Sequence, residues 1–459
     1  AELDNCQTKK SLSQEGEKSM KKLLVLLTAV AMLISLTSIV SASEFSFYGN
    51  LRLKTFSWED SKEVNAVPFQ DEVQIPAAGT TEESNLTDNA LAFNESDRDL
   101  DLSMSVISRF GTKVTISDEL RAHLEFGLKG NSNSTTVYLR HLYGEYDFGA
   151  GKILVGQYWH PFAVNVGWSN QVGNDDDGLG TVGGFTAGRR PQVRLSFGDF
   201  AIHFMSPDHK QIAGIGDGFK QNDAALWDGT ADVVVYDSNK HYDDDISWPH
   251  VAAVYNATYE NFKFGITGAF QSYEVSDTRN GMYYDIVDDE NKVGGKSYDV
   301  DSHGLKFGVQ GDFGLFTLGA TYGFGQNLDN MGIGAESKKG GATPGAFYRG
   351  IMVADDTYKY GAGAADTIGD VDTTAYTIVG AFKVNDMVTL EAGYGKISND
   401  VDCAAQDDEA RAYYLQAAIK VADGFQVTPE IGKYDYEEDG SGKDEGDATY
   451  FGAKWQINF

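Results

Sequence analysis

The last twelve residues of the chain, ATYFGAKWQINF (448–459), alternate between apolar and polar side chains. One face would carry Phe451 and Trp455, and the other would carry Lys454 and Gln456. A period of two is typical of a β-strand, because successive side chains in a strand point to opposite sides of the sheet. This stretch therefore predicts a strand with one apolar and one polar face.

The same alternation begins at Phe45–Phe56 and recurs in pairs of segments joined by very short links, which is the pattern of β-hairpins. The pairs are Val106–Ile116 with Leu120–Lys129, Val137–Tyr146 with Lys152–Trp159, Gln192–Phe197 with Phe200–Met205, Val251–Tyr259 with Phe262–Tyr273, His303–Asp312 with Leu315–Phe324, Thr374–Val384 with Met387–Ile397, and Ala410–Val421 with Phe425–Tyr434. Seven hairpins and two end strands give sixteen predicted strands.

Eight long links alternate with the seven short ones, and they are polar, glycine-rich and acidic. They are Glu59–Asp99, Gly130–Thr136, His160–Arg190, Ser206–Pro249, Glu274–Asp301, Gly325–Asp372, Ser398–Glu409 and Asp435–Asp447. Outer-membrane barrels have short periplasmic turns and long outer loops. The sequence thus predicts an all-β fold: a transmembrane antiparallel β-barrel of 16 strands, with residues 43–459 as a single domain.

Three details of this barrel are left to the structure. Eighteen strands stay possible, because Glu59–Asp99 could contain a further hairpin. Pro429 falls inside a strand and removes a donor from the ladder, so we expect a bulge there. Aromatic residues near strand ends are expected to form the two interfacial girdles: Tyr48, Phe148, Tyr259, Phe262, Tyr273, Phe313 and Trp455. The alternative fold is a soluble sandwich or propeller, but no repeat of blade length occurs.

Composition excludes several classes of protein. The formal net charge is -31, from 37 Lys+Arg against 68 Asp+Glu, and such a chain repels nucleic acid. Two cysteines cannot make a disulfide scaffold. Aromatic residues make up 12% of the chain, which is too many for a disordered protein.

An export signal is predicted near the N-terminus. Met20 is followed by two lysines, by an apolar run at Leu23–Leu36 and by the small residue Ala42. This order is typical of a secretory signal peptide over residues 20–42, with a single membrane anchor as the alternative. Residues 1–19 would be an upstream extension or a cloning scar. Export and a barrel together predict a location in the outer membrane of the cell.

Several motifs resemble the Gram-negative general porins. The similar segments are SRFGTK (108–113), DELRA (118–122), LEF (124–126), RHLYG (140–144), LVGQ (154–157) and the closing WQINF (455–459). The resemblance implies a homotrimer of water-filled barrels. It also implies that the C-terminal Trp455 and Phe459 form the assembly signal that the barrel assembly machinery reads, before the protein meets outer-membrane lipid.

The resemblance further implies that the third long loop, His160–Arg190, folds inward and sets acidic groups opposite basic ones. The acidic candidates for the pore constriction are Asp175, Asp176 and Asp177, which could instead be a solvated loop tip. The period of two supplies basic residues on the lumen face of the first strands: Arg52, Arg109, Arg121 and Arg140 for the constriction, and Lys54 and Lys113 for the pore lining. The phase of the strand that carries Arg140 is ambiguous. These arginines could also be general lumen wall, or pair with local acids such as Glu125.

The predicted function is passive diffusion of small hydrophilic solutes and ions, without chemistry. The acidic excess predicts a mild preference for cations. The alternatives are a substrate-specific channel for sugars or organic acids and a plugged barrel that serves as an adhesin or structural protein. No motif of an enzyme is found: Gly-x-Ser-x-Gly is absent, and no nucleophile is paired with a base.

No cofactor or metal is predicted, with one alternative in the acidic outer loops. Asp435-x-Glu437-x-Asp439-Gly440 resembles half a calcium loop. The twelfth position would be Gly446, where a calcium loop has a bidentate glutamate.

Overall fold

The structure is a computed structural model that describes residues 44–61, 97–130, 135–163, 166–173, 178–180, 182–207, 242–277, 282–285, 290–293, 297–334, 351–353, 367–401, 406–438 and 444–459. The predicted signal peptide and the residues before it lie outside these ranges. Among the described residues, no helix is long and apolar enough to cross a membrane.

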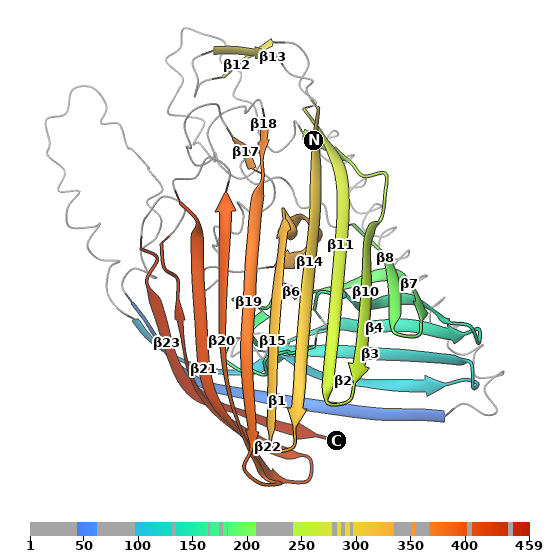
Figure 1. Cartoon of the computed structure of the whole chain (residues 1–459), viewed down its shortest axis with the longest axis vertical. Coiled ribbons are helices and arrows are strands. Elements are labelled where there is room, and N and C mark those ends of the chain that lie inside the picture. Colours follow the sequence, from blue (N-terminus) through green and yellow to red (C-terminus); the bar gives the residue numbers. More distant parts are fainter. Residues whose placement is uncertain are drawn as a thin grey trace, which may run out of the picture.

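Sixteen antiparallel strands follow one another around a closed barrel (Figure 1). They are β1 (Glu44–Asp60), β2 (Asp97–Thr115), β3 (Leu120–Gly130), β4 (Thr135–Asp147), β5 (Lys152–Trp159), β7 (Arg189–Phe197), β8 (Phe200–Met205), β10 (His250–Tyr259), β11 (Phe262–Asp277), β14 (Ser297–Phe313), β15 (Phe316–Gln326), β19 (Val371–Lys383), β20 (Val388–Val401), β21 (Asp408–Ala422), β22 (Phe425–Asp435) and β23 (Asp447–Asn458). Every predicted strand is present, so the predicted fold class is confirmed.

The first and last strands close the barrel, and in Figure 1 the blue β1 lies beside the red β23. Their register runs from Asn50↔Asn458 to Asp60↔Ala448. Beyond it, Gly49 and Phe459 exchange two backbone hydrogen bonds of 2.7 and 3.0 Å. On its other edge β1 pairs directly with β2. No further strand stands between β1 and β2 in the wall, so the ring that the described residues form has sixteen strands.

The strands segregate apolar and polar side chains as a membrane barrel requires. Large apolar side chains point outward along the strands, with exposed fractions of 77% at Phe47 and 60% at Phe451. Alternate residues point inward and are polar or small, and no sheet edge is left between β1 and β23. A closed barrel with an apolar outside is the architecture of outer-membrane proteins, because lipid cannot satisfy unpaired backbone groups.

The predicted aromatic girdles are correct for five residues and wrong for two. Phe148, Tyr259, Phe262, Phe313 and Trp455 are exposed on the outside of the barrel. Tyr273 is buried with 4% of its surface exposed, and Tyr48 donates a hydrogen bond to the buried Glu125 in the lumen. Both lie near strand ends, but their phase in the strand turns them inward.

The expected bulge at Pro429 does not form. Pro429 stands opposite Ala453 in unbroken register with β23. Toward β21 the pairing passes from Gln416↔Glu430 to Ile419↔Val427 without a change of register. The missing proline donor therefore leaves a gap in one ladder and inserts no extra residue. The register shift of this hairpin lies nearer its turn, between Lys420 and Ala422.

Short elements beyond the sixteen long strands complete the described structure. β9 (Tyr242–Asp245) extends the wall beside β11, and β12 (Met282–Asp285) pairs with β13 (Glu290–Val293). β17 (Ile351–Val353) pairs with β18 (Thr367–Gly369). Two 3-10 turns are η1 (Gly178–Gly180) and η3 (Leu328–Met331). β6 (Thr186–Ala187) joins the third long loop to β16 (Ile333–Gly334), in the loop that follows β15.

Candidate functional site

A β-bulge in β4 turns two consecutive side chains into the lumen. Between β3 and β4 the register shifts, so that Glu125 stands opposite His141 while Phe126 stands opposite Leu139. Arg140 has no partner in this register and becomes the extra residue. Both Arg140 and His141 are buried on the inner side, at 1% and 5% exposure. The bulge explains why a period of two could not assign a phase to Arg140.

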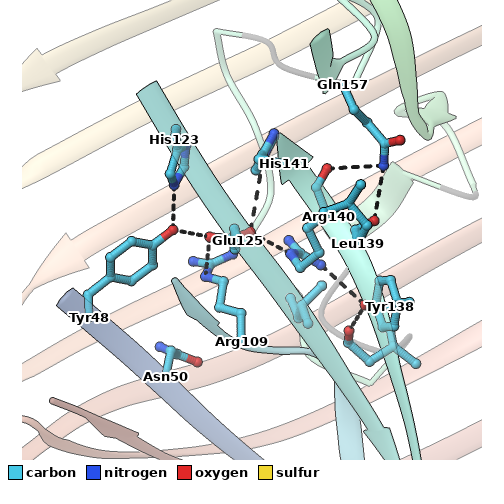
Figure 2. A network of polar contacts seen from close by, with 12 residues as sticks. Tyr48, Asn50, Arg109, His123, Glu125, Tyr138, Leu139, Arg140, His141 and Gln157 are labelled. Carbon is cyan, nitrogen blue, oxygen red and sulfur yellow. Dashed lines mark hydrogen bonds and ion pairs between the residues drawn. The ribbon is translucent and has the colours of Figure 1, made fainter. Parts of the chain in front are cut away.

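Glu125 is the centre of a polar network on this wall (Figure 2). Arg140 donates from Nε to Oε1 over 2.6 Å, and the Tyr48 hydroxyl donates to Oε2 over 2.6 Å. The Arg109 guanidinium forms an ion pair with Oε2 at 3.7 Å. Four strands thus meet at one buried carboxylate, which two guanidinium groups share. Two guanidinium groups and one carboxylate give this cluster a net positive charge.

Arg189 extends this basic wall, although sequence analysis placed it within the third loop. It opens β7 opposite Trp159 of β5. Its guanidinium lies 3.5 Å from the centre of the Trp159 ring, and that of Arg140 lies 5.8 Å from the same ring. Stacking on indole stabilises a cation that burial would otherwise penalise. The signal in the sequence was a tryptophan and an arginine at the two ends of one loop.

We name the chain between Trp159 and Arg189 the constriction loop, after the role that the sequence resemblance predicts for it. Its described residues lie against the inner wall opposite the Glu125 network. Lys306 of β14 is 1% exposed and donates from Nζ to the backbone oxygens of Phe162, at 3.2 Å, and Gly184. One buried ammonium group therefore holds the loop by two carbonyls that are far apart in its sequence.

Two carboxylates hold the same loop by its backbone N–H groups. Asn170 donates from its backbone nitrogen to Glu391 of β20 over 2.9 Å. Val172 and Gly173 each donate to Glu430 of β22 over 2.7 Å. The wall thus supplies an acceptor for loop N–H groups and a donor for loop carbonyls. The sequence does not identify Glu391, Glu430 or Lys306 as loop contacts, because no motif in their strands distinguishes them from other residues that face the lumen.

Glycine allows the loop to approach the wall closely. A Cβ at Gly395 of β20 would collide with the carbonyl oxygen of Val182 in the loop. In return, Gly183 has a φ of +100° and packs against the backbone of Tyr376. Only glycine combines this conformation with the absence of a side chain. The close approach accounts for part of the high glycine content of the chain.

A cluster of aromatic rings supports the loop from behind. The Trp58 ring lies 4.6 Å from that of Tyr450 and 6.1 Å from that of Tyr434. Tyr450 is fully buried, accepts from Gln171 of the loop over 2.7 Å and donates to Glu430 over 2.8 Å. Because Tyr434 and Tyr450 are buried, these rings pack the loop and form no open track for solutes.

The remaining predicted basic residues are spread along the lumen. Arg52 lines a cavity under the loop. Lys54 is buried and pairs with Asp101 at 3.1 Å, and Lys113 lies 5.9 Å from the centre of the Tyr48 ring. Arg121 shares a face of β3 with Glu125 but lies four residues nearer the turn, where it is exposed. The structure therefore gathers Arg109 and Arg140, and does not bring Arg121 to them.

The structure describes the two residues of the predicted assembly signal but not the three acidic candidates for the constriction. Asp175, Asp176 and Asp177 lie outside the described residues. Trp455 is half-exposed on the outside of β23 and donates from Nε1 to the Thr55 hydroxyl over 3.1 Å. Phe459 is 70% exposed at the end of the chain.

A buried histidine lies at the start of the constriction loop. His160 Nδ1 accepts from the backbone nitrogen of Phe162 over 3.1 Å, and its Nε2 lies 3.4 Å from Nε2 of His250. Complete burial, together with the nearby His250 and Arg190, holds the pKa of His160 well below its ordinary value of 6.5. Burial at the first turn of the loop therefore disfavours the charged form of this imidazole.

Two carboxylates of the possible calcium loop form ion pairs with one arginine. Arg411 contacts Asp435 at 2.7 Å and Glu437 at 3.1 Å. Asp439 and Gly440 lie outside the described residues. Within the part of the chain that the structure describes, no group of three or more His, Cys, Asp or Glu is placed to hold a metal ion.

No model of a protein family matches the sequence, and comparison with curated proteins finds no match. Solved structures similar to this chain include OmpT of Vibrio cholerae in its trimer form, with 16% identity, 91% of this chain and 100% of that chain covered, and a TM-score of 0.48. An anion-selective porin from Comamonas acidovorans has 14% identity, 91% and 100% coverage, and a TM-score of 0.47. OmpF of Salmonella typhi in complex with daunomycin has 12% identity, 90% and 97% coverage, and a TM-score of 0.48.

Likenesses this distant carry no argument about the site. The sixteen-strand barrel that the sequence resemblance predicts is established by the strand pairing of the chain itself.

Proposed function

We propose that this protein is an outer-membrane porin through which small hydrophilic solutes and ions diffuse passively. The observation that carries the proposal is the backbone of the constriction loop, bound to the inner wall by Lys306, Glu391 and Glu430. A loop held in this way narrows a polar lumen to a fixed size. Selection by size and charge then needs no chemical step.

The proposed selectivity is mild and leans toward cations. The chain carries a net charge of -31, and runs of acidic residues fill its outer loops, so cations would be enriched at the mouth. The wall around Arg109, Arg140 and Arg189 opposes this preference deeper in the lumen. The two fields act in series, which is why the net preference is expected to be small.

The proposed assembly is a homotrimer in outer-membrane lipid. The outer faces of β1 to β5 carry exposed apolar residues such as Phe47, Leu102 and Val137, which lipid or a neighbouring copy can cover. The exposed Trp455 and Phe459 are proposed to be the signal that the barrel assembly machinery reads.

Conductance of the refolded protein in a planar bilayer, under a KCl gradient, tests the channel role. We expect large steps that arrive in threes, with a reversal potential on the cation side. Equal permeabilities for K⁺ and Cl⁻ would reject the cation preference alone. A folded barrel that gives no steps would reject diffusion and favour a plugged barrel that acts as an adhesin or structural protein.

The second candidate is a channel specific for sugars or organic acids. The polar cavity beneath the constriction loop favours it, because a pore without subsites needs no such space. Liposome swelling with neutral and acidic solutes of one size would separate the candidates: a general porin passes them at similar rates, whereas a specific channel does not.

A further inference from the structure

A cavity of about 420 Å³ lies between the constriction loop and the inner wall of β20 to β23 and β1. The loop supplies Trp168, Ser169 and Asn170, and the wall supplies polar side chains from five strands. A space of this size holds a small solute and not merely a few water molecules. It is distinct from the Glu125 network, none of whose members line it.

The cavity has a cationic side. Arg52 of β1 stands opposite Gln456 of β23, and Lys454 is two residues before Gln456 on the same face. Side chains at such diagonal positions lie within reach of one another when they are long. Arg52 and Lys454 therefore present two positive charges from adjacent strands to one region of the cavity.

The other side is anionic. Glu391 lies on β20, separated from β23 in the wall by β21 and β22. Four donors hold its carboxylate in place: the Asn170 backbone nitrogen at 2.9 Å and Nδ2 at 2.7 Å, the Tyr414 hydroxyl at 2.5 Å and Gln416 Nε2 at 3.0 Å. Between the two sides, Gln426 and Thr428 of β22 line the cavity with neutral polar groups.

From this charge separation we infer that the cavity is a subsite for small zwitterionic peptides. The carboxylate of such a solute lies toward the positive charges of Arg52 and Lys454. Its ammonium group lies toward the negative field of Glu391. A simple anion is repelled by Glu391, and a simple cation is repelled by Arg52 and Lys454. The cavity therefore favours a solute that carries both charges. This inference rests on the proposed channel function and names a solute class for it.

The distance between the two sides indicates the length of the solute. Four strand spacings, each about 4.8 Å, separate β20 from β1 along the curved wall. The side chains reach inward from both ends and shorten this gap. An extended tripeptide spans at most about 10 Å, whereas a single amino acid spans about a third of that. A short peptide therefore matches the gap better than a single amino acid does.

Calorimetry on the refolded barrel in detergent tests binding apart from transport. The probes are triglycine, its N-acetylated form, which is an anion, and its C-terminal amide, which is a cation. We expect triglycine to bind at least ten-fold more tightly than either derivative, and to block KCl current in a planar bilayer in the same order. If the acetylated peptide binds as well as triglycine, the site takes anions and the inference is wrong; equal binding of the amide would refute it in the same way.

The variants Arg52→Gln and Lys454→Gln should each weaken triglycine binding at least five-fold. Lys383→Gln is the matched control, because Lys383 pairs with Asp386 at a short turn and does not line the cavity. Normal KCl steps without triglycine binding would overturn this inference and leave the channel role intact. Triglycine binding to a barrel that gives no steps would overturn the channel role instead.

Discussion

At the scale of single residues, Glu125 joins four strands of the lumen wall. Its carboxylate neutralises one of the two guanidinium groups that contact it and also accepts from Tyr48. Arg140 is 1% exposed, so it cannot exchange this partner for water. The one carboxylate thus sets both the local stability of four strands and the net charge of the basic wall.

Glu125→Gln should raise the positive field of the lumen and destabilise the barrel. Breaking a buried ion pair from one side costs roughly 3 kcal/mol, because the other charge stays buried. We expect an earlier midpoint in urea unfolding and a reversal potential shifted toward anions. Glu119→Gln, in the exposed turn before β3, is the control for the loss of one negative charge. An unchanged reversal potential in Glu125→Gln would contradict the role of the network.

His160 gives a second prediction at this scale, on pH. Its folded pKa lies well below 6.5, so the unfolded chain binds a proton near pH 6.5 that the folded chain does not. Stability is therefore fully present above the unfolded pKa and is lost as the pH falls below it. His160→Asn keeps an acceptor for Phe162 and should flatten this part of the pH dependence of the urea midpoint. A slope equal to that of the unchanged protein would show that other groups cause it.

At the scale of elements, the constriction loop is bound through its backbone. Its carbonyls contact Lys306, and its N–H groups contact Glu391 and Glu430. Because the loop contributes backbone groups here, these contacts tolerate a change of side chain in the loop. They do not tolerate a change of the wall side chain that binds the loop. The position of the loop is therefore determined by strands far from it in sequence.

Lys306→Met should loosen the loop while keeping the apolar stem of the side chain. Two loop carbonyls lose their donor, and each buried unsatisfied group costs about 1–3 kcal/mol. We expect larger single-channel conductance with more current noise in a planar bilayer. Lys383→Met, at a short turn, should behave as the unchanged protein. If conductance and noise stay the same in Lys306→Met, this lysine does not hold the constriction.

At the scale of the whole molecule, the barrel depends on one closing seam. β1 and β23 pair over eleven residues, and Gly49 and Phe459 continue the pairing to the end of the chain. The Phe459 ring covers Gly49, where a Cβ would collide with it. The last residue therefore contributes both its backbone and its side chain to closure.

Deletion of Phe459 should harm closure more than Phe459→Ala. Deletion removes two backbone hydrogen bonds, each worth about 1 kcal/mol, together with the ring. The alanine variant loses the ring alone. We expect slower refolding into the heat-resistant form seen by gel mobility, in the order unchanged protein, alanine variant, deletion. Equal refolding of the two variants would mean that the backbone bonds at the seam contribute little.

The sequence by itself determined where the strands lie, how many there are and which way most side chains point. All sixteen predicted strands are present, because alternation with a period of two is a local property of an extended backbone with one apolar face. The same local rule found Arg52, Lys54 and Arg109 on the inner side. It placed Arg140 there too but left the phase of its strand ambiguous, because a bulge adds one residue and breaks the period.

Only the tertiary structure decided which residues meet. Glu430 contacts a loop 257 residues away, and Lys306 contacts carbonyls 122 and 144 residues away. Arg189 stacks on Trp159 because β5 and β7 are neighbours in the wall. Such contacts depend on the register of every strand between the two residues and on closure of the barrel. A local pattern contains neither, so the wall residues that contact the third long loop could not be identified from the sequence.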